Sequence, residues 1–279
     1  METKIINGRR VRDEILERVK SEIEKLSFTP KFCDVVVGDD PASLQYVRMK
    51  NKTAEVLGIV PVDARMSASC TTEELITKIE ELNNIEYMAG IIVQLPLPEH
   101  IDRDRVLRVI DPNLDVDCIN PENSKIFYQG GETYVFPTAR AVFAVLENIS
   151  FSVSKKKVTM IGRGELVGRP VSYFLEKLGA EVFIIDSTKK DVDQILKNSD
   201  LIISACGKRG IVTKENIKKG VVVIDAGASD ADGSVVGDID FESLLGITSF
   251  ISPVPGGVGP VTVAMLFDNV LMSAKKMSR

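Results

Sequence analysis

Histidine is almost missing from this chain of 279 residues, which contains a single one, His100. It follows Pro98 and Glu99 in what reads as a loop, so a serine–histidine–aspartate triad or a zinc site built on histidines is nearly excluded by inventory. Any acid–base chemistry must therefore fall to lysine, tyrosine or carboxylate side chains.

Cysteine is also sparse, and the four cysteine residues lie far apart in the chain. There is no Cys-x-x-Cys pair and no neighbouring histidine that could complete a metal site. We therefore predict no metal, and expect buried or incidental thiols at Cys33, Cys70, Cys118 and Cys206.

No stretch of the sequence is apolar for long enough to span a membrane, and the first residues lack the layout of a signal peptide. The formal charge of −5 and the pI near 5.2 argue against a nucleic-acid binder, because phosphate binding needs a dense basic surface. The sequence thus predicts a cytoplasmic protein that binds neither nucleic acid nor membrane.

The length exceeds that of a typical single core and predicts two domains. Predicted strands alternate with predicted helices, first over residues 4–110, where Thr72 is the expected cap of a helix over 72–82. The alternation is more regular in the second half, with strands predicted near residues 157–161, 181–185, 201–204 and 221–225. This alternation is typical of α/β folds with parallel sheets, in which ligands gather at the carboxyl ends of the strands. Residues 120–137 look like an irregular crossover between the two halves, and residues 138–148 like a bridging helix.

Lys50 lies on the apolar side of a helix predicted over residues 41–57, with Ser43 as N-cap and Gly58 as the terminating residue. At about 100° per residue it falls inside an apolar arc. A lysine there either snorkels to water, the commoner arrangement, or is held where its charge is unfavourable and its proton leaves more readily. The arc consists of Leu44, Val47, Ala54 and Leu57, with Tyr46 beside Lys50.

Polar side chains follow the next predicted strand of this half. Gln94 ends the strand 90–96, at the edge where ligands gather. Asp115 and Asp117 alternate around Val116, so an extended segment would place both carboxylates on one face. They could bind a cation, accept hydrogen bonds from an amino-heterocycle or be plain turn residues.

In the second half, Gly162 opens a G-x-G-x-x-x-G turn between a strand and a helix, where a dinucleotide fold places its phosphate loop. Asp186 closes the following strand, where an acidic residue would bind the ribose diol of NAD; alternatively it is a turn residue. Four neighbours could instead surround the 2′-phosphate of NADP: Arg163, Ser187, Lys189 and Lys190.

The proline- and glycine-rich run 252–262 is a loop with fixed turns and exposed backbone amides. Thr262 is predicted to cap a last helix that reaches about Met277. A rigid hinge between domains is an alternative interpretation of the same run, and the two do not exclude each other.

Taken together, these stretches resemble the bifunctional methylenetetrahydrofolate dehydrogenase/methenyltetrahydrofolate cyclohydrolase family nearly end to end. The two most specific segments are Val-Gln-Leu-Pro-Leu-Pro over residues 93–98 and Pro-Val-Pro-Gly-Gly-Val-Gly-Pro over residues 253–260. Further matches are Val-Gly-Asp-Asp-Pro-Ala-Ser at 37–43, Tyr-x-x-x-Lys at 46–50, Asp-Val-Asp at 115–117, Gly-Arg at 162–163, Val-Gly-x-Pro at 167–170 and Val-Gly-Asp at 236–238.

The resemblance implies NADP-dependent oxidation of methylenetetrahydrofolate and hydrolysis of the methenyl product, within one-carbon metabolism and purine biosynthesis. Lys50 would serve both steps, Tyr46 would stack on the folate ring, Gln94 would orient Lys50 and Asp117 would hold the aminopyrimidine edge. The implied substrate-binding residues are Tyr46, Lys50, Val93, Gln94, Leu95, Asp117, Pro255, Gly256, Gly257, Val258 and Thr262. The implied cofactor-binding residues are Gly162, Arg163, Gly164, Ser187 and Ala228, with NADP favoured and NAD possible.

The same resemblance implies a homodimer of two-domain chains with a cleft between the domains. Residues 1–137 and 256–279 would form the folate-binding catalytic domain, and residues 138–255 a doubly wound dinucleotide-binding domain of Rossmann type. The chain departs from the family where a serine usually follows Gly-Arg, since Gly164 stands there. Two alternatives stay open: a dehydrogenase that has lost hydrolysis, and a non-catalytic dinucleotide sensor.

Overall fold

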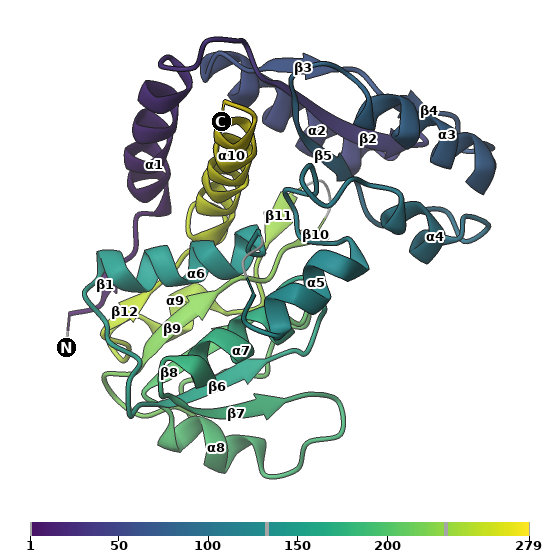
Figure 1. Cartoon of the computed structure of the whole chain (residues 1–279). Helices are drawn as coiled ribbons and strands as arrows, with labels where there is room; N and C mark the ends of the chain where they lie inside the picture. The colour runs from purple at the N-terminus through teal and green to yellow at the C-terminus, as the bar shows by residue number, and fades with distance from the viewer. Residues whose placement is uncertain (1, 132–133, 232–233, 279) are drawn as a thin grey trace. The chain divides into compact units, whose positions relative to one another are not determined.

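The structure is a computed structural model that describes residues 2–131, 134–231 and 234–278 (Figure 1). The chain divides into two compact units. Unit 1 comprises Met1–Asp13 and Thr138–Thr262, and unit 2 comprises Glu14–Pro137 and Val263–Arg279. Each unit carries helices on a parallel sheet, which confirms the predicted pair of α/β domains; the cleft between them stays a prediction.

Unit 1 is built on a sheet of six parallel strands in the described part of the chain, in the order β1-β12-β9-β8-β6-β7. The chain runs from β6 outward to β7 and then crosses back to β8 on the other side of β6. Ligands of doubly wound folds bind at such a switch point. The strands are β1 (Lys4–Ile5), β6 (Lys157–Ile161), β7 (Glu181–Ile185), β8 (Leu201–Ser204), β9 (Val222–Asp225) and β12 (Phe250–Ile251).

Every residue of the central strands β8 and β9 is buried, as expected for parallel strands covered on both faces. On one face, Leu196 of a short helix packs with Ile202 and Val223 of these strands. The remaining elements of unit 1 are α6 (Pro137–Asn148), α7 (Gly168–Lys177), α8 (Val192–Asn198), α9 (Phe241–Leu244) and the antiparallel pair β10 (Ser229–Ala231) and β11 (Ser234–Val236).

Unit 2 is centred on β2 (Lys31–Val37), which pairs in parallel with β5 (Met88–Val93), β3 (Val60–Val62) and β4 (Arg65–Met66). Because side chains alternate along a strand, β2 contributes to two separate cores. Phe32 packs in one of them, and Cys33 with Val35 in the other.

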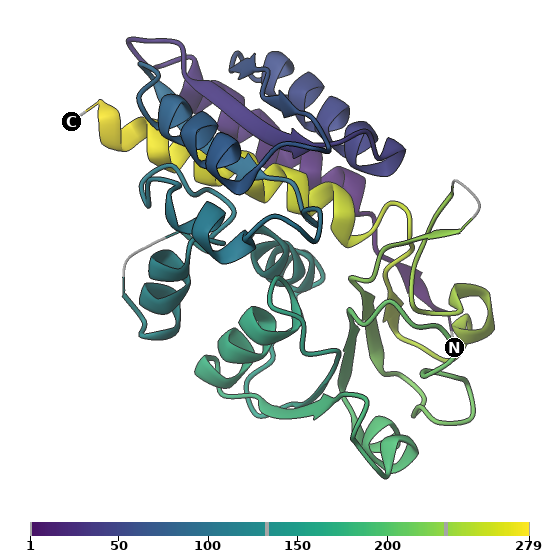
Figure 2. The same ribbon diagram turned by 90° about the vertical axis from the view of Figure 1, so that its right-hand side faces the viewer.

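Helices cover both faces of this sheet. The Phe32 core is closed by α1 (Gly8–Ile23), α2 (Pro41–Val56) and α10 (Val258–Met277), and α1 and α10 lie side by side in Figures 1 and 2. The Cys33 core is closed by α3 (Thr72–Asn83) and α4 (Arg103–Arg108).

Several predicted helix starts are wrong by a few residues. Asp40 rather than Ser43 caps α2, because its carboxylate accepts the Ser43 N–H at 2.7 Å. Thr71 rather than the following threonine caps α3, in a reciprocal capping box with Glu74. Thr262 lies inside α10 and caps nothing, since the helix already begins at Val258.

The stretch 120–137, predicted to be irregular, contains the helix α5 (Pro121–Tyr128). Asn120 caps it by accepting the Glu122 N–H at 2.8 Å, and Pro121 starts its first turn. Residues 132–133 of the stretch lie outside the described residues.

The compact units differ from the domain boundaries that the resemblance implies. Residues 1–13 group with unit 1 because Ile5 of β1 pairs with Ile251 of β12. Residues 256–262 also group with unit 1, so the chain passes into unit 2 within α10.

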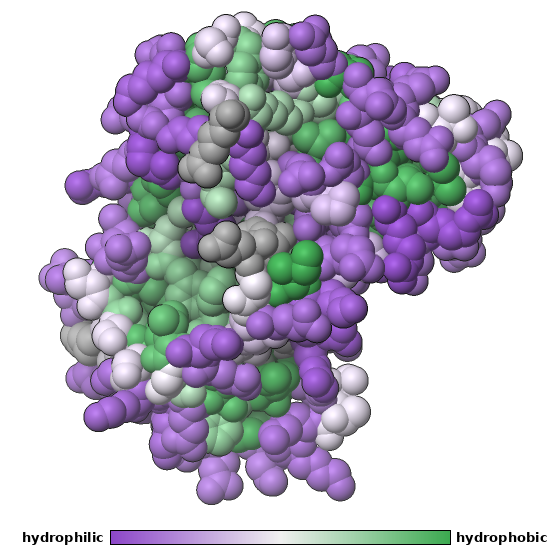
Figure 3. Space-filling model, in the orientation of Figure 1, coloured by the Kyte–Doolittle hydropathy of each residue, from purple (hydrophilic) through white to green (hydrophobic). Residues whose placement is uncertain are grey.

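None of the helices formed by the described residues is both long and apolar enough to cross a membrane. Hydrophilic side chains cover most of the face shown in Figure 3, and the apolar side chains on it form separate smaller areas.

Candidate active site

Lys50 is buried in unit 2 between two polar partners. Its side chain is 11% exposed, and its Nζ lies 2.5 Å from Oδ2 of Asp34. Nζ also donates a hydrogen bond of 2.9 Å to Oε1 of Gln94. The lysine therefore does not snorkel to water, and its predicted place on the apolar side of this helix is confirmed; the carboxylate of Asp34 beside it was not expected.

The spacing of apolar residues along α2 determines which side of the helix faces the sheet, and Lys50 lies on that side. The helix ends at Val56 with Leu57 as its C-cap, and Gly58 takes a positive φ of 80°, as predicted for its C-terminus. Ala54 and Leu57 are buried in the core that α2 shares with β2. Since residues three or four apart lie on the same side of a helix, Lys50 points toward the same sheet face as Ala54.

Asp34 meets Lys50 from the middle of β2. Strand alternation directs Asp34 to the side of Phe32, which α2 covers, and away from Cys33 and Val35. Its side chain is fully buried, and burial raises the pKa of the carboxyl, while the charge and the contact of Lys50 lower it. Neither oxygen of Asp34 accepts a hydrogen bond of good geometry from a residue that the structure describes, so the 2.5 Å contact of Oδ2 with Lys50 is an ion pair.

Gln94 directly follows β5, the strand that pairs with β2. Its N–H donates to the carbonyl of Val35 at 2.8 Å and so extends the pairing of the two strands by one residue. Its Nε2 donates to the carbonyl of Leu95 at 3.2 Å, which leaves Oε1 to accept from Lys50. The amide is thus held as an acceptor for the amine.

Asp117 lies in a segment that α10 holds in place, since Asn269 donates from its Nδ2 to the carbonyl of Val116 at 2.7 Å. Burial raises the pKa of Asp117 to about 6; the charge of Lys50 lowers it and that of Asp34 raises it further. Asp117 as a whole residue is half-buried.

Asp115 has a different environment from Asp117. It is fully buried, and its carboxylate accepts hydrogen bonds from the N–H groups of Ile119 and Asn120 and from the side chain of Asn123. Of the three interpretations left open for this carboxylate, the structure supports that of a turn residue.

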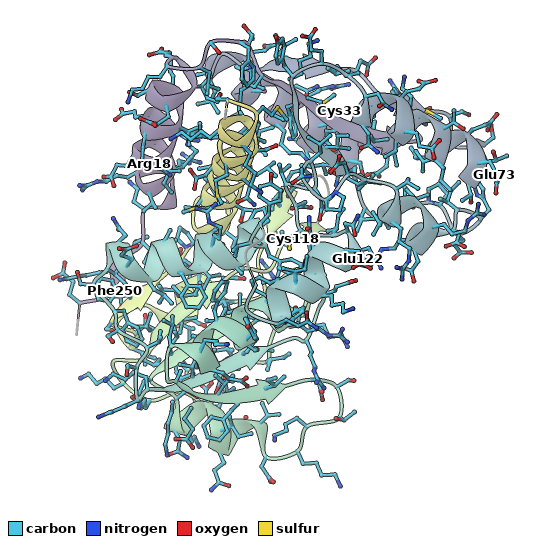
Figure 4. All side chains as sticks on the ribbon, viewed as in Figure 1. Arg18, Cys33, Glu73, Cys118, Glu122 and Phe250 are labelled. Carbon is cyan, nitrogen blue, oxygen red and sulfur yellow. The ribbon has the colours of Figure 1, made fainter. Side chains whose placement is uncertain are left out.

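The remaining predicted residues of unit 2 lie around this cluster in the chain. Tyr46, one turn before Lys50 on α2, is 40% exposed. Val93 is buried at the end of β5, and Leu95 is half-buried after it. Figure 4 labels Cys33 and Cys118, which adjoin Asp34 and Asp117 in the chain.

Asp34 is the site residue that our sequence interpretation missed. A signal was present, because it is the only charged residue between Phe32 and Val37 in an otherwise apolar strand. Aspartate and lysine are almost never fully buried without a partner, so a charged residue in a buried strand predicts an opposite charge nearby.

The predicted phosphate loop of unit 1 lies at the switch point of the sheet, between the ends of β6 and β8. Gly162 has a φ of 100°, and a Cβ there would lie 2.4 Å from the carbonyl oxygen of Ala205. A Cβ on Gly168 would lie 2.3 Å from the carbonyl oxygen of Gly162. Only glycine fits at these two positions, whereas Gly164 faces open space and Arg163 is exposed. This loop fits a dinucleotide pyrophosphate approaching its backbone.

At the end of β7, Asp186 is already engaged by its own loop. Its Oδ1 accepts the hydroxyl of Thr188 at 2.7 Å and the Thr188 N–H at 2.9 Å. These hydrogen bonds hold the pKa of Asp186 below its usual range, and the charges of Arg163 and Lys189 lower it further. Ser187 and Ala228 are exposed in unit 1.

The proline- and glycine-rich loop belongs to unit 1, where it packs on the start of α1. The Gly8 N–H donates to the carbonyl of Gly256 at 3.0 Å, and a Cβ on Gly8 would lie 1.8 Å from the carbonyl oxygen of Gly257. Pro255 is exposed, Val258 is buried, and Thr262 donates to the carbonyl of Val258 at 3.3 Å. A role of this loop beside Lys50 stays a prediction.

The switch-point glycine loop of unit 1 is typical of dinucleotide-dependent enzymes, and unit 2 carries a buried cluster of Lys50, Asp34 and Gln94. The chain belongs to the tetrahydrofolate dehydrogenase/cyclohydrolase family. Residues 6–117 match the family's catalytic domain, and residues 137–278 match its NAD(P)-binding domain.

Relatives match over the whole chain. The bifunctional protein FolD of Staphylococcus carnosus is 38% identical over 283 residues, which cover 100% of this chain and 99% of the relative. The structure of the bifunctional FolD dehydrogenase/cyclohydrolase of Campylobacter jejuni has a TM-score of 0.95 and 35% identity, covering 99% of both chains. The Trypanosoma brucei enzyme, solved with NADP and an inhibitor, has a TM-score of 0.94 and 34% identity, covering 100% of this chain and 99% of its own.

Proposed function

We propose that this chain oxidises 5,10-methylenetetrahydrofolate to 5,10-methenyltetrahydrofolate with NADP and then hydrolyses the product to 10-formyltetrahydrofolate. The observation that carries the proposal is the buried amine of Lys50, held by Asp34 at 2.5 Å and Gln94 at 2.9 Å in the unit that matches the catalytic domain. The names of the full-length relatives support both activities.

For hydrolysis, water must lose a proton as it attacks the methenyl carbon, and Lys50 is the proposed acceptor of that proton. Gln94 holds the amine in one direction through a hydrogen bond to Nζ. Asp117 would accept the parallel N–H donors of the aminopyrimidine edge, as a carboxylate does with a guanidinium. Tyr46, exposed one turn away, would stack on the pterin ring.

For oxidation, bound NADP would supply the acceptor for the hydride that leaves the methylene carbon. The backbone of Gly162 and Gly164 would face the pyrophosphate, and the loop from Pro255 would line the folate and nicotinamide ends of the site. Ala228 would lie near the carboxamide. These are the roles that the family resemblance assigns.

The environment of Asp186 supports NADP over NAD. Thr188 donates twice to Oδ1 of Asp186, so Oδ2 is the oxygen left to accept hydrogen bonds from a ribose diol. The positive charges of Arg163 and Lys189 also lower the pKa of the Asp186 carboxyl, so basic side chains lie near the end of β7. We propose that Arg163, together with Ser187, contacts the 2′-phosphate.

We expect the purified chain to oxidise methylenetetrahydrofolate with a kcat/KM at least about tenfold higher for NADP than for NAD, the typical effect of one charged hydrogen bond to the 2′-phosphate. Nucleotide reduction followed at 340 nm measures the oxidation, and loss of methenyltetrahydrofolate absorbance measures the hydrolysis.

Variants of two basic residues test the nucleotide preference. Arg163→Ala should bring the two nucleotides to similar kcat/KM values, whereas Lys156→Ala, at the opposite end of β6, should keep the preference. NADP binding without turnover of either folate would contradict the proposed function and favour a dinucleotide sensor.

The role of Asp117 predicts a dependence of folate binding on pH. The carboxylate must be ionised to accept two N–H groups, and its pKa is raised to about 6. Binding is therefore intact above that pH and weakens as the pH falls through it. The KM for methenyltetrahydrofolate should rise by roughly tenfold for each pH unit below 6, since the ionised fraction falls in that proportion.

Initial rates between pH 5 and 8, corrected for spontaneous hydrolysis, measure this KM. Asp117→Asn serves as the matched variant, and its KM should be high throughout and lose this dependence. A KM of the native chain that stays constant down to pH 5 would refute the assigned role.

We also propose a cytoplasmic homodimer. The family resemblance supports the dimer, and the four free cysteines suit a reducing compartment. A monomer mass in sedimentation equilibrium at micromolar concentration would contradict the dimer.

A further inference from the structure

Asp34 is a buried carboxylate in contact with Lys50, and the proposed function gives it no part in proton transfer or in folate binding. It lies in the middle of β2, where its neighbours Cys33, Val35 and Val36 are apolar and buried. The side chain has no exposed surface, and the closest charge to it is the amine of Lys50 at 2.5 Å. A carboxylate is rarely placed in such a strand without a specific partner.

Two partners of different kinds hold the amine of Lys50 in place. An ammonium group carries three N–H donors in a tetrahedral arrangement. Gln94 accepts a hydrogen bond from one of these donors at 2.9 Å from Nζ, and Oδ2 of Asp34 lies in ion-pair contact with Nζ at 2.5 Å. The hydrogen bond and the ion pair together restrict the directions from which the amine, when it carries a lone pair, can accept a proton.

We propose that Asp34 is a positioning residue for Lys50, which orients the amine and balances the positive charge that Nζ gains when it accepts a proton during hydrolysis. This inference rests on the proposed cyclohydrolase activity. Asp34 touches neither folate nor nucleotide in this proposal and acts only through Lys50.

The step balances without any further reactant. The oxygen of water bonds to the methenyl carbon, and the π electrons of the C=N bond move to nitrogen. One O–H bond of the water breaks, and its proton goes to the lone pair on Nζ. The pair then consists of an ammonium and a carboxylate in contact, which a buried site stabilises far more than separated charges.

Other charges around Nζ do not replace Asp34. From the segment before α5, Asp117 acts on Lys50 as a second anion, but it is half-buried and the structure gives it no hydrogen bond to Nζ among the described contacts. Gln94, after β5, is uncharged. On α2 itself, Tyr46, Arg48 and Lys52 are exposed.

Two substitutions separate orientation from charge. Asp34→Asn keeps an oxygen that can accept from Nζ but removes the charge, and Asp34→Val removes both. An adjacent anion favours the protonated amine, so without it the lone pair is present at lower pH. The acidic limb of the kcat profile for methenyltetrahydrofolate hydrolysis should move to lower pH by about one unit or more in both variants.

The plateau rate should fall in both variants, because the new positive charge lacks its counter-ion. We expect a loss of about tenfold in Asp34→Asn and a larger loss in Asp34→Val, which also loses the orientation. Rates are measured from pH 5 to 10 on full-length protein, with Asp104→Asn on α4 as the matched control; the Asp104 side chain is 76% exposed. Circular dichroism establishes that each variant is folded.

An acidic limb that stays in place in Asp34→Asn, with only a uniform loss of rate, would overturn the proposal and leave Asp34 a structural residue. If the native chain does not hydrolyse methenyltetrahydrofolate at all, the proposed function itself fails. The two failures are therefore distinguishable in one set of assays.

Discussion

Replacing Lys50 with methionine should lower the rate of methenyltetrahydrofolate hydrolysis by about 10²- to 10⁴-fold, the usual contribution of a positioned acid–base group. Methionine keeps the length and the apolar contacts of the lysine stem but has no amine to accept a proton. Gln94 and Asp34 would lose the group that both of them contact. The chain has one histidine, His100, whose ring lies against the carbonyl of Cys70. No imidazole is therefore placed to accept the proton instead of Lys50.

The assay compares initial hydrolysis rates of Lys50→Met, Lys52→Met and the native chain at pH 7.5. Lys52 lies two residues away on the same helix and is exposed, so its variant controls for loss of a positive charge on α2. Hydrolysis at the native rate in Lys50→Met would rule out the lysine as proton acceptor. Oxidation of methylenetetrahydrofolate by the same preparation shows whether the two activities separate.

The same substitution should also destabilise the protein by about 3–5 kcal/mol near neutral pH, because removing one member of a buried ion pair leaves the other charge uncompensated. As whole residues, Asp34 and Lys50 are 3% and 9% exposed to solvent, so water cannot replace the missing amine. Asp34→Val/Lys50→Met should recover most of this free energy of unfolding, since two apolar side chains then fill the site.

The pH dependence of this loss has a defined sign. Burial raises the pKa of Asp34 in the folded protein, and the opposing effect of Lys50 disappears in Lys50→Met. A carboxyl whose folded pKa lies above its unfolded value destabilises the fold as pH rises through the folded pKa. The deficit of Lys50→Met should therefore shrink as the pH is lowered.

Urea unfolding followed by far-ultraviolet circular dichroism measures these free energies, because the chain has no tryptophan for fluorescence. The native chain, both single variants and the double variant form a thermodynamic cycle, whose coupling free energy isolates the pair. A double variant as unstable as the sum of the two single variants would show that the pair contributes nothing.

Local sequence determined much of the fold of unit 1. The strands Lys157–Ile161, Glu181–Ile185 and Leu201–Ser204 have the predicted bounds to the residue. Each is a short apolar run between polar turns, and a strand buried on both faces needs no other pattern. Helix starts were less predictable, as at Asp40 and Thr71, because adjacent polar residues compete for one capping position.

By itself, the sequence determined the family, the two α/β units and the apolar phase that brings Lys50 against the sheet. Helical period and motif spacing are local properties of the sequence, so they can be predicted without knowing which residues contact each other in the fold. The family resemblance already implied that Gln94, 44 residues further along, contacts Lys50, and only the tertiary structure decided that Asp34 is the second partner. The physical reason is that strand pairing and helix docking select which buried polar groups meet, and the free energy of a buried charge depends on that meeting.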